Sequence, residues 1–195
     1  EIRLSLVGSE MCIRDRNIND PEFHELLVRW FEYGCFCPVM RLHGYRWPLQ
    51  PQYGTTGGAT CVSGAPNEVW SYTDQVCEIL SDYLRLRERM LPYITELMEE
   101  AHEKGTPVMR PLFYDFPEDK ESWNVETEYM FGPKVLVKPI TDADARETDV
   151  YLPGGASWTN AWTGETFEGG QKVHVAAPIE QIPLFTRDGY KLPMK

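Results

Sequence analysis

The sequence of 195 residues has no run of Lys and Arg, and 30 acidic residues face 19 basic ones, so that the formal net charge is −11. Binding to nucleic acid needs a concentrated basic surface, and adsorption to an anionic membrane needs the same. Long apolar runs are missing too, and none approaches the roughly 18 residues of a membrane-spanning helix. These absences predict no nucleic-acid partner and no membrane contact.

Only five cysteines are present, an odd number without the spacing of a disulfide framework: Cys12, Cys35, Cys37, Cys61 and Cys77. The C-x-C pair at 35 and 37 lacks the C-x2-C spacing of common zinc and dithiol redox sites, and no second pair follows. A metal site made from this pair and His43 is therefore not expected. Free thiols favour a reducing compartment such as the cytoplasm.

Signatures of several enzyme classes are also missing. The sequence contains no G-x-S-x-G elbow, no glycine-rich phosphate loop and no H-E-x-x-H motif. Carboxylates are numerous, but their positions favour helix caps and solvated helix faces, and no pair is placed as a general acid and a nucleophile. The residues by themselves identify no catalytic centre.

The first sixteen residues, EIRLSLVGSEMCIRDR, have no cap, sustained period or turn pattern that connects them to the residues after Arg16. They lack the features of a secretory signal peptide, and the sequence does not begin with Met. The stretch resembles a translated sequencing adaptor. We therefore set residues 1–16 aside as a non-native segment and expect the real sequence to start at Asn17.

A helix is predicted to begin at Asp20, because an Asp cap followed by proline at the first helical position favours that start. Apolar residues at helical spacing form one face, and Gly34 is expected to end the helix. The apolar run 35–44 suits a short buried strand. Residues 45–66, with scattered Gly and Pro, are expected to form a long loop, a kind of segment that is usually functional.

A second, longer helical stretch is predicted to follow this loop. Asn67 is expected to cap it, and an apolar stripe runs through residues 76–91. Pro92 must kink or restart the helix, and Gly105 is expected to end it. One helix, one buried strand and a long helix cannot enclose a core alone, so this part is typical of the end of an α/β barrel.

After residue 106 the hydrophobic period changes. Short β-rich runs are separated by Gly, Pro and Asp, which is typical of an antiparallel β-sandwich or barrel. We therefore predict two units, an α/β segment over 17–110 and an all-β domain over 111–195. The β-rich runs are VMRPLFYDF, KVLVKPI, TDVYLP, QKVHVAAP and IPLFTR.

The run GCFCPVMRLHGYRWP, residues 34–48, is the main candidate for a functional site. Arg41 and His43 would lie on one face at the carboxyl end of the expected strand, because residues two apart on a strand share a side. In an α/β barrel, side chains at that edge meet substrate, and an arginine there suits a contact with a carboxylate. The competing interpretations are a structural histidine and a salt bridge that only shapes the pocket.

Five stretches, in this order, resemble a known family: ELLVRWFEYGCFCPVMRLHG, LRLRERMLPYITELMEEAHEKGTPVMRPLFYDFP, EYMFGPKVLVKPI, VYLPGGASWTNAWTGETFEGGQ and APIEQIPLFTRDG. They extend from about Asn17 to Pro193. The family is glycoside hydrolase family 31, the α-glucosidases and α-xylosidases, and the resemblance is to its C-terminal portion. The LPYI…RPL stretch and the YMFGP motif are the most specific parts.

The resemblance implies that residues 17–110 are the last units of a (β/α)8 TIM barrel and that residues 111–195 are an antiparallel β-sandwich domain. It implies a retaining α-glycosidase that cleaves α-glucosides or α-xylosides at the non-reducing end, using two aspartates as nucleophile and acid/base. Because glycoside hydrolysis of this type runs on carboxylates alone, the resemblance implies no metal or organic cofactor. Both aspartates would lie upstream of Asn17. The chain alone is therefore expected to be inactive and prone to aggregate.

The resemblance also assigns roles to the candidate residues. His43 matches the family's histidine that hydrogen-bonds sugar hydroxyls in the −1 subsite, and Arg41 matches the arginine beside it. Trp47 or Tyr53 could contact the aglycone, although packing of the long loop is the favoured interpretation for both. The expected partner is a carbohydrate substrate, and the alternative function is a non-catalytic carbohydrate-binding or scaffold protein.

Overall fold

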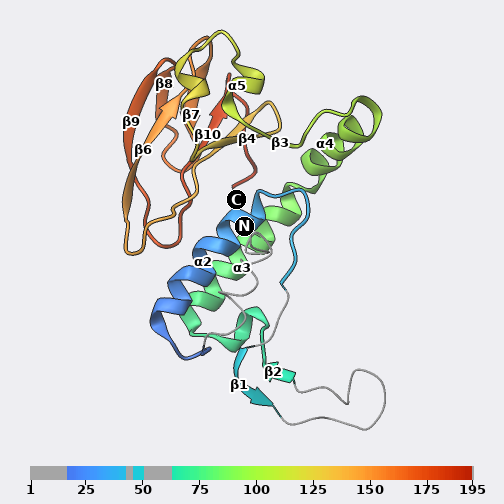
Figure 1. Ribbon diagram of the computed structural model, residues 1–195, viewed down its shortest axis with the longest axis vertical. Coiled ribbons are helices and arrows are strands. Elements are labelled where there is room, and N and C mark those ends of the chain that lie inside the picture. The colour runs from blue at the N-terminus through green and yellow to red at the C-terminus, as the bar shows by residue number, and fades with distance from the viewer. Residues whose placement is uncertain (1–16, 43–45, 51–62, 195) are drawn as a thin grey trace, which may run out of the picture.

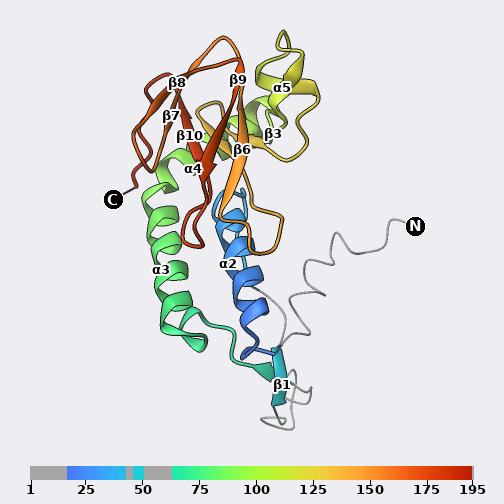
Figure 2. The same ribbon diagram turned by 90° about the vertical axis from the view of Figure 1, so that its left-hand side faces the viewer.

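The computed structural model describes residues 17–42, 46–50 and 63–194. Most strands gather at one end of the molecule, and the long helices extend from them toward the other end, where a two-stranded antiparallel sheet lies (Figure 1). Helices α2 and α3 run side by side, as Figure 2 shows from a perpendicular direction. Among the described residues, every strand pairing is antiparallel and no closed barrel is present. None of the described helices is long and apolar enough to cross a membrane.

Helix α2, Pro21–Cys35, begins where the sequence predicts. The Asp20 side chain accepts a hydrogen bond from the backbone N–H of Glu22 at 3.1 Å, and proline occupies the first turn. The helix runs one residue past Gly34, the expected end. Its apolar face is buried, chiefly through Phe23, Leu27, Val28 and Phe31.

The strand predicted over residues 35–44 is wrong in the part that the structure describes. Cys35 belongs to α2, and residues 36–42 form a turn followed by bends, without strand pairing. The N–H groups of Phe36 and Cys37 donate to the carbonyls of Tyr33 and Gly34. Apolar residues suit a strand only where a neighbouring strand offers a ladder, and no described strand pairs here.

The prediction of an unbroken loop over residues 45–66 is wrong as well. Strand β1, Arg46–Gln50, pairs antiparallel with strand β2, Ser63–Ala65, and the register shifts along the pair. Pro48 lies within β1, where it cannot donate to the ladder, which fits an irregular edge strand. Gly and Pro in this interval indicate turns, but they do not reveal which separated residues will pair.

Helix α3, Asp74–Arg89, is capped by Thr73 and not by Asn67 as predicted. The Thr73 hydroxyl accepts from the N–H of Val76 at 3.3 Å, whereas Asn67 Oδ1 accepts from the Tyr72 hydroxyl at 2.6 Å. A short 3-10 turn, η3 (Val69–Ser71), separates Asn67 from the helix. The capping side chain is therefore the polar residue nearest the helix start, after an extra turn that periodicity did not reveal.

The predicted restart at Pro92 is confirmed, because helix α4, Leu91–Lys104, carries this proline in its first turn. The predicted end at Gly105 is also confirmed. This glycine has a φ of 71°, a left-handed conformation that closes the helix and favours glycine. Local chemistry thus determines both ends of α4.

The remaining residues form two antiparallel sheets and two short helical turns. A six-stranded sheet has the order β3-β4-β5-β10-β7-β8, and β6 pairs with β9 in a two-stranded sheet. The elements are β3 (Met109–Arg110), α5 (Leu112–Asp115), η4 (Glu121–Trp123), β4 (Tyr129–Phe131), β5 (Val135–Val137), β6 (Glu147–Leu152), β7 (Ser157–Asn160), β8 (Thr166–Glu168), β9 (Gln171–Ala176) and β10 (Leu184–Arg187).

Each of the five β-rich runs contains a strand, but VMRPLFYDF is a strand only at Met109–Arg110. Its second half is the helical turn α5, because Pro111 cannot donate to a ladder and instead begins a turn. Two apolar clusters fill the interior. One joins α2, α3 and α4 to strands β4, β5 and β10, and the other lies within the β part around Trp158 and Phe185. The first cluster makes the helices and the sheet one packed unit.

Candidate functional site

Arg41, the one described residue of the predicted sugar-binding pair, lies shortly after the end of α2 and is exposed. His43 lies outside the described residues, as does Tyr53, and Trp47 lies in β1. The structure therefore does not test whether Arg41 and His43 meet at one site. The structure does show which side chains bind the backbone of residues 35–38, shortly before Arg41.

Four consecutive backbone carbonyls, starting at the last residue of α2, accept hydrogen bonds from side chains of other elements. The Arg87 guanidinium, on α3, donates to the carbonyls of Cys35 at 2.7 Å, Cys37 at 2.8 Å and Pro38 at 3.0 Å. The Tyr129 hydroxyl, on β4, donates to the carbonyl of Phe36 at 3.0 Å. The last carbonyls of a helix lack intrahelical donors, so these side chains satisfy groups that would otherwise need water.

A second polar network joins α2 to the segment between β9 and β10. Arg29 Nη1 donates a hydrogen bond to Glu32 Oε2 at 3.0 Å, and both side chains are buried. The Arg29 guanidinium also donates to the carbonyls of Ala177 at 2.8 Å, Pro178 at 3.1 Å and Ala145 at 3.1 Å. Both terminal nitrogens of the guanidinium are used in this way and hold the β part onto α2, whereas the buried Nε has no partner.

The other carboxylate oxygen of Glu32 faces α3. Tyr83 lies with its hydroxyl 3.1 Å from Glu32 Oε1, and the same hydroxyl accepts from the N–H of Ile182 at 3.0 Å. Burial raises the pKa of Glu32 to about 8, although the charge of Arg29 acts in the opposite direction. The arrangement is a structural junction between α2, α3 and the β part, because Glu32 is almost wholly inaccessible to a substrate.

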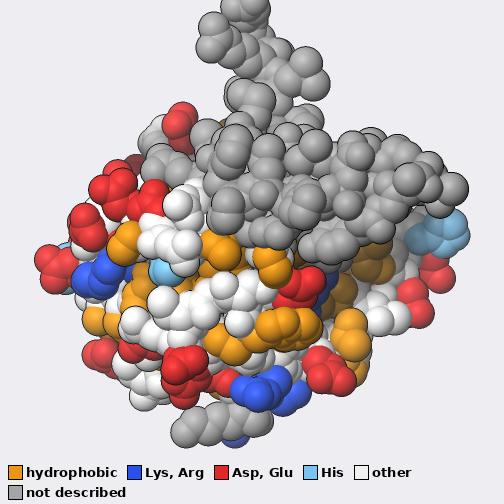
Figure 3. Space-filling view, turned by 90° about the horizontal axis from the view of Figure 1, so that it is seen from below, with side chains coloured by type: hydrophobic (Ala, Val, Ile, Leu, Met, Phe, Trp, Pro, Cys, Tyr) orange, Lys and Arg blue, Asp and Glu red, His pale blue; other side chains and the backbone are white. Residues whose placement is uncertain are grey.

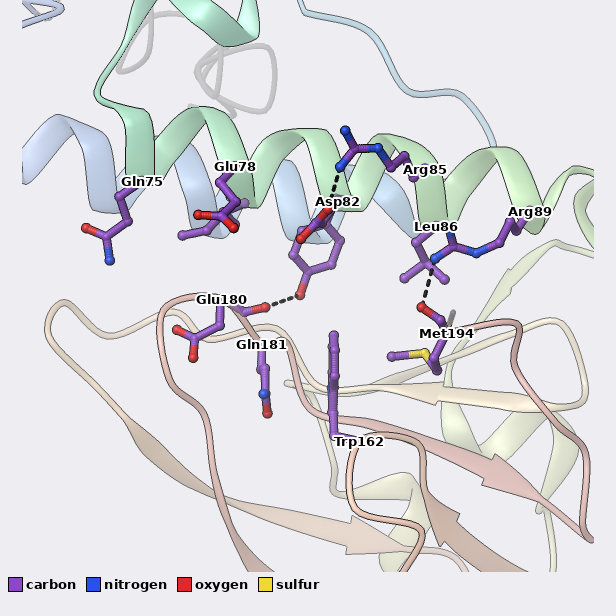
Figure 4. Close-up of a pocket in the computed structure, with 12 residues that line it drawn as sticks. Gln75, Glu78, Asp82, Arg85, Leu86, Arg89, Trp162, Glu180, Gln181 and Met194 are labelled. Carbon is purple, nitrogen blue, oxygen red and sulfur yellow. Dashed lines mark hydrogen bonds and ion pairs between the residues drawn. The ribbon is translucent and has the colours of Figure 1, made fainter.

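A groove of about 680 Å³ lies beside this junction, between α3 and the β part (Figure 4). Gln75, Glu78 and Asp82 line its α3 side, and Trp162 and Gln181 line the opposite side. The Trp162 indole N–H is already used, because it donates to the carbonyl of Ile182 at 2.7 Å. Arg41 does not line this groove, so the groove and the predicted sugar contact are separate features.

The described cysteines are buried or half-buried thiols. Cys35 Sγ donates to the carbonyl of Tyr83 and Cys37 Sγ to that of Tyr33, each at 3.4 Å. Burial raises the pKa of Cys35 to about 12, so this group stays protonated and poorly nucleophilic at neutral pH. In the part of the chain that the structure describes, no group of three or more His, Cys, Asp or Glu could hold a metal ion.

Large apolar side chains are exposed along the helices. Figure 3 shows hydrophobic side chains gathered in the middle of the face at the lower end of the molecule, with acidic side chains around them. Such exposure favours a covering partner or further chain. Exposed large side chains of the helices include Trp30, Leu84, Leu91 and Met98.

The sequence pattern did not indicate which residues bind the carbonyls of residues 35–38, the stretch that leads to Arg41. Arg87 and Cys37 are 50 positions apart, and Tyr129 and Phe36 are 93 positions apart. No local period connects residues at these separations. The available signal was indirect: Arg87 lies in LRLRERMLPYI and Tyr129 in EYMFGP, two of the stretches that carry the family resemblance.

Comparison with protein families gives two adjoining matches. Residues 2–97 match the glycosyl hydrolases family 31 TIM-barrel domain, and residues 105–192 match the glycosyl hydrolase family 31 C-terminal domain. The barrel match includes most of residues 1–16, which the sequence analysis sets aside. That segment lies outside the described residues, so its origin stays a prediction.

Curated relatives are longer than this chain. The α-xylosidase of Saccharolobus solfataricus is 36% identical over 172 residues, which are 88% of this chain and 21% of the relative. Alpha-glucosidase 2 of Bacillus thermoamyloliquefaciens is 36% identical over 166 residues, which are 85% of this chain and 19% of the relative. The chain thus spans about a fifth of the length of these proteins.

Solved structures have the same arrangement. A family 31 α-xylosidase from a soil metagenome, complexed with xylose, superposes with a TM-score of 0.85 at 46% identity, over 92% of this chain and 26% of that one. A family 31 dextranase from Flavobacterium johnsoniae, complexed with glucose, has a TM-score of 0.74 at 30% identity, over 89% and 20% of the two chains. From these matches and the two family models, we conclude that the chain belongs to glycosyl hydrolase family 31.

Proposed function

We propose that the chain is the C-terminal part of an α-glycosidase that hydrolyses α-xylosides or α-glucosides. The observation that carries the proposal is the similarity to the xylose-complexed α-xylosidase, at 46% identity over 92% of this chain. The curated relatives named α-xylosidase and alpha-glucosidase support the same two substrate classes. In this proposal, residues 17–110 contribute the end of a catalytic barrel, and residues 111–195 form a β-sandwich domain beside it.

Arg41 and His43 are the residues proposed to contact the sugar. Arg41 is exposed and follows a backbone segment whose carbonyls are bound by Arg87 and Tyr129. An arginine on a well-held segment can donate several hydrogen bonds to a polar ligand with little loss of conformational entropy. His43 follows two residues later and is proposed to donate to a sugar hydroxyl.

The nucleophile and the acid/base are proposed to be aspartates of a longer gene product, upstream of Asn17. Hydrolysis with retention needs both carboxyl groups, about 5 Å apart, because one forms the glycosyl intermediate and the other transfers the proton. Contacts with the sugar bind the substrate, but they give no route to cleavage when both carboxyl groups are missing. The chain of 195 residues is therefore proposed to be inactive by itself.

The test is to resequence the gene upstream of Asn17 and to express the longest reading frame. We expect several hundred further residues with two barrel aspartates, and hydrolysis of 4-nitrophenyl α-D-xylopyranoside or α-D-glucopyranoside. Residues 1–195 expressed alone should release no nitrophenol, and the longer product with either aspartate changed to Asn serves as the control. A reading frame that starts at Asn17, with sugar binding but no hydrolysis, would favour the non-catalytic carbohydrate-binding alternative.

A further inference from the structure

We propose that Arg87 is a positioning residue for the sugar contact of Arg41, an inference that rests on the proposed function. Arg87 donates to three carbonyls of the four-residue stretch 35–38, and Arg41 follows Pro38 by three positions. The guanidinium therefore determines the path of the backbone that leads to Arg41. It acts through this backbone and need not touch the sugar.

The chemistry of the guanidinium suits this role. Its planar fork presents several donors in fixed directions, so one side chain can bind carbonyls that point differently, whereas a lysine ammonium acts as a compact charge. Hydrogen bonds from a charged donor are about twice as strong as those between neutral groups. Three such bonds at 2.7–3.0 Å hold the turn more firmly than ordinary turn hydrogen bonds would.

Arg87 and Tyr129, which bind the carbonyls of residues 35–38, are themselves held in place by the packed core. Leu86, beside Arg87 on α3, is buried, and Tyr83 one turn earlier is buried against α2. Tyr129, which binds the carbonyl of Phe36, packs edge-on against Tyr33 with ring centroids 6.0 Å apart. Because α3 and β4 both belong to the packed unit, loss of Arg87 should release the turn without unfolding either element.

Released backbone would misplace Arg41 relative to the sugar. A displacement of about 1 Å in a binding group can lower activity by roughly 100-fold. We therefore expect Arg87→Gln in the longer gene product to lower kcat/KM for the 4-nitrophenyl α-glycosides by about 10-fold or more. Arg87→Lys, which keeps the charge but not the fork, should lose less activity than Arg87→Gln.

Arg89 provides a matched control on the same helix. Its guanidinium also binds backbone carbonyls, those of Pro193 and Met194, each at 2.8 Å. Arg89→Gln removes the same kind of contact but leaves the hydrogen bonds to the carbonyls of residues 35–38 in place. Its kcat/KM should therefore stay within about 2-fold of wild type. Thermal unfolding of each variant is measured first, and activity is assayed well below every midpoint.

A double-mutant cycle with Arg41→Ala separates positioning from general stability. If Arg87 acts through Arg41, the loss in the double variant should be clearly smaller than the product of the two single losses, because the Arg41 contact that Arg87 positions is already gone. Additive losses, or an unchanged kcat/KM in Arg87→Gln, would overturn the inference. If Arg87→Gln does not fold, Arg87→Lys is used for the cycle with the same two readings.

The outcomes also separate this inference from the proposed function. A wild-type product that hydrolyses a glycoside while both Arg87 variants keep full kcat/KM refutes only the role of Arg87. Full activity in Arg41→Ala refutes the role of Arg41 and the inference together. A wild-type product with both aspartates that cleaves neither glycoside refutes the proposed substrate class, and the inference with it.

Discussion

The hydroxyl of Tyr83 on α3 lies 3.1 Å from Oε1 of Glu32 on α2, and both residues are buried. Through the same hydroxyl and through Arg29, this pair is connected to the segment between β9 and β10. A small polar cluster therefore joins the helices to the β part. Buried polar groups are costly when unpaired, so this junction should respond strongly both to pH and to mutation.

Stability should fall as the pH rises through neutrality. Burial raises the pKa of Glu32 from 4.5 to about 8, so between about pH 5 and 8 the folded protein keeps a proton that the unfolded chain has released. The stabilisation from the protonated Glu32 is complete below the pKa of the unfolded chain, 4.5, and is lost as the pH rises through the pKa in the folded protein, about 8. The thermal midpoint of wild type should be lower at pH 8 than at pH 5.

Glu32→Gln isolates this contribution, because glutamine keeps the shape of the side chain and does not titrate. The difference in midpoint between pH 5 and pH 8 should be smaller in this variant than in wild type. Some dependence should remain, since burial also raises the pKa of Glu128 to about 7. An identical pH dependence in wild type and Glu32→Gln would refute the assignment.

Tyr83→Phe should destabilise the protein although it removes a single oxygen atom. The N–H of Ile182 and the carboxyl group of Glu32 would both lose a partner in a buried place, and each unsatisfied group costs about 1–3 kcal/mol. Tyr114→Phe is the control. Tyr114 is exposed, so its loss should change the free energy of unfolding by less than about 0.5 kcal/mol. Equal effects of the two changes in denaturant unfolding would contradict the prediction.

Gly132→Ala should be among the most destabilising small changes. Gly132 has a φ of 61°, and an added Cβ would meet the Tyr93 hydroxyl and the Leu97 side chain. The expected cost is about 3 kcal/mol, from left-handed strain of about 1–2 kcal/mol and from overpacking. Gly155→Ala separates the two causes, because Gly155 has a φ of 84° but nothing lies near its Cβ position. It should show the strain alone, and similar midpoints for the two variants would exclude crowding.

Residues 1–195 expressed alone should self-associate. Leu84 and Leu91 on the helices are 43% and 51% exposed, which favours contact with other apolar surface. The chain should bind a hydrophobic dye and elute early in size-exclusion chromatography. Leu84→Lys together with Leu91→Lys should reduce both effects without unfolding the helices, whereas a monomeric chain that binds no dye would contradict the prediction.

Features determined by neighbouring residues were the predictable ones. The start of α2 at Asp20, the restart of the helix at Pro92 and the end at Gly105 depend on contacts within one turn, so their signals lie side by side in the sequence. The cap at Asn67 failed, although it is local, because an extra 3-10 turn changed which polar residue stood at the helix start.

The predicted strand over residues 35–44 shows where sequence reasoning stops. Its apolar residues indicated burial, and Cys35 and Phe36 are buried. A strand exists only if another strand lies beside it, however, and the carbonyls of residues 35–38 are instead bound by side chains of α3 and β4. Arg41 became a candidate through its place in the expected strand and through the family resemblance, but neither predicted its environment. Arg87 and Tyr129 act over 50 and 93 positions, beyond the reach of any period.

The sequence by itself determined the family, the change from helices to antiparallel strands, and the ends of α4, because these depend on motif order, hydrophobic period and local caps. Only the tertiary structure decided that Arg29, Glu32 and Tyr83 join the two parts and that Arg87 holds the segment before Arg41. Each of these buried polar groups needs a partner to offset its loss of water. Apart from the contact between Arg29 and Glu32 within α2, the partners that join the two parts and hold residues 35–38 lie 49 or more positions away in the chain.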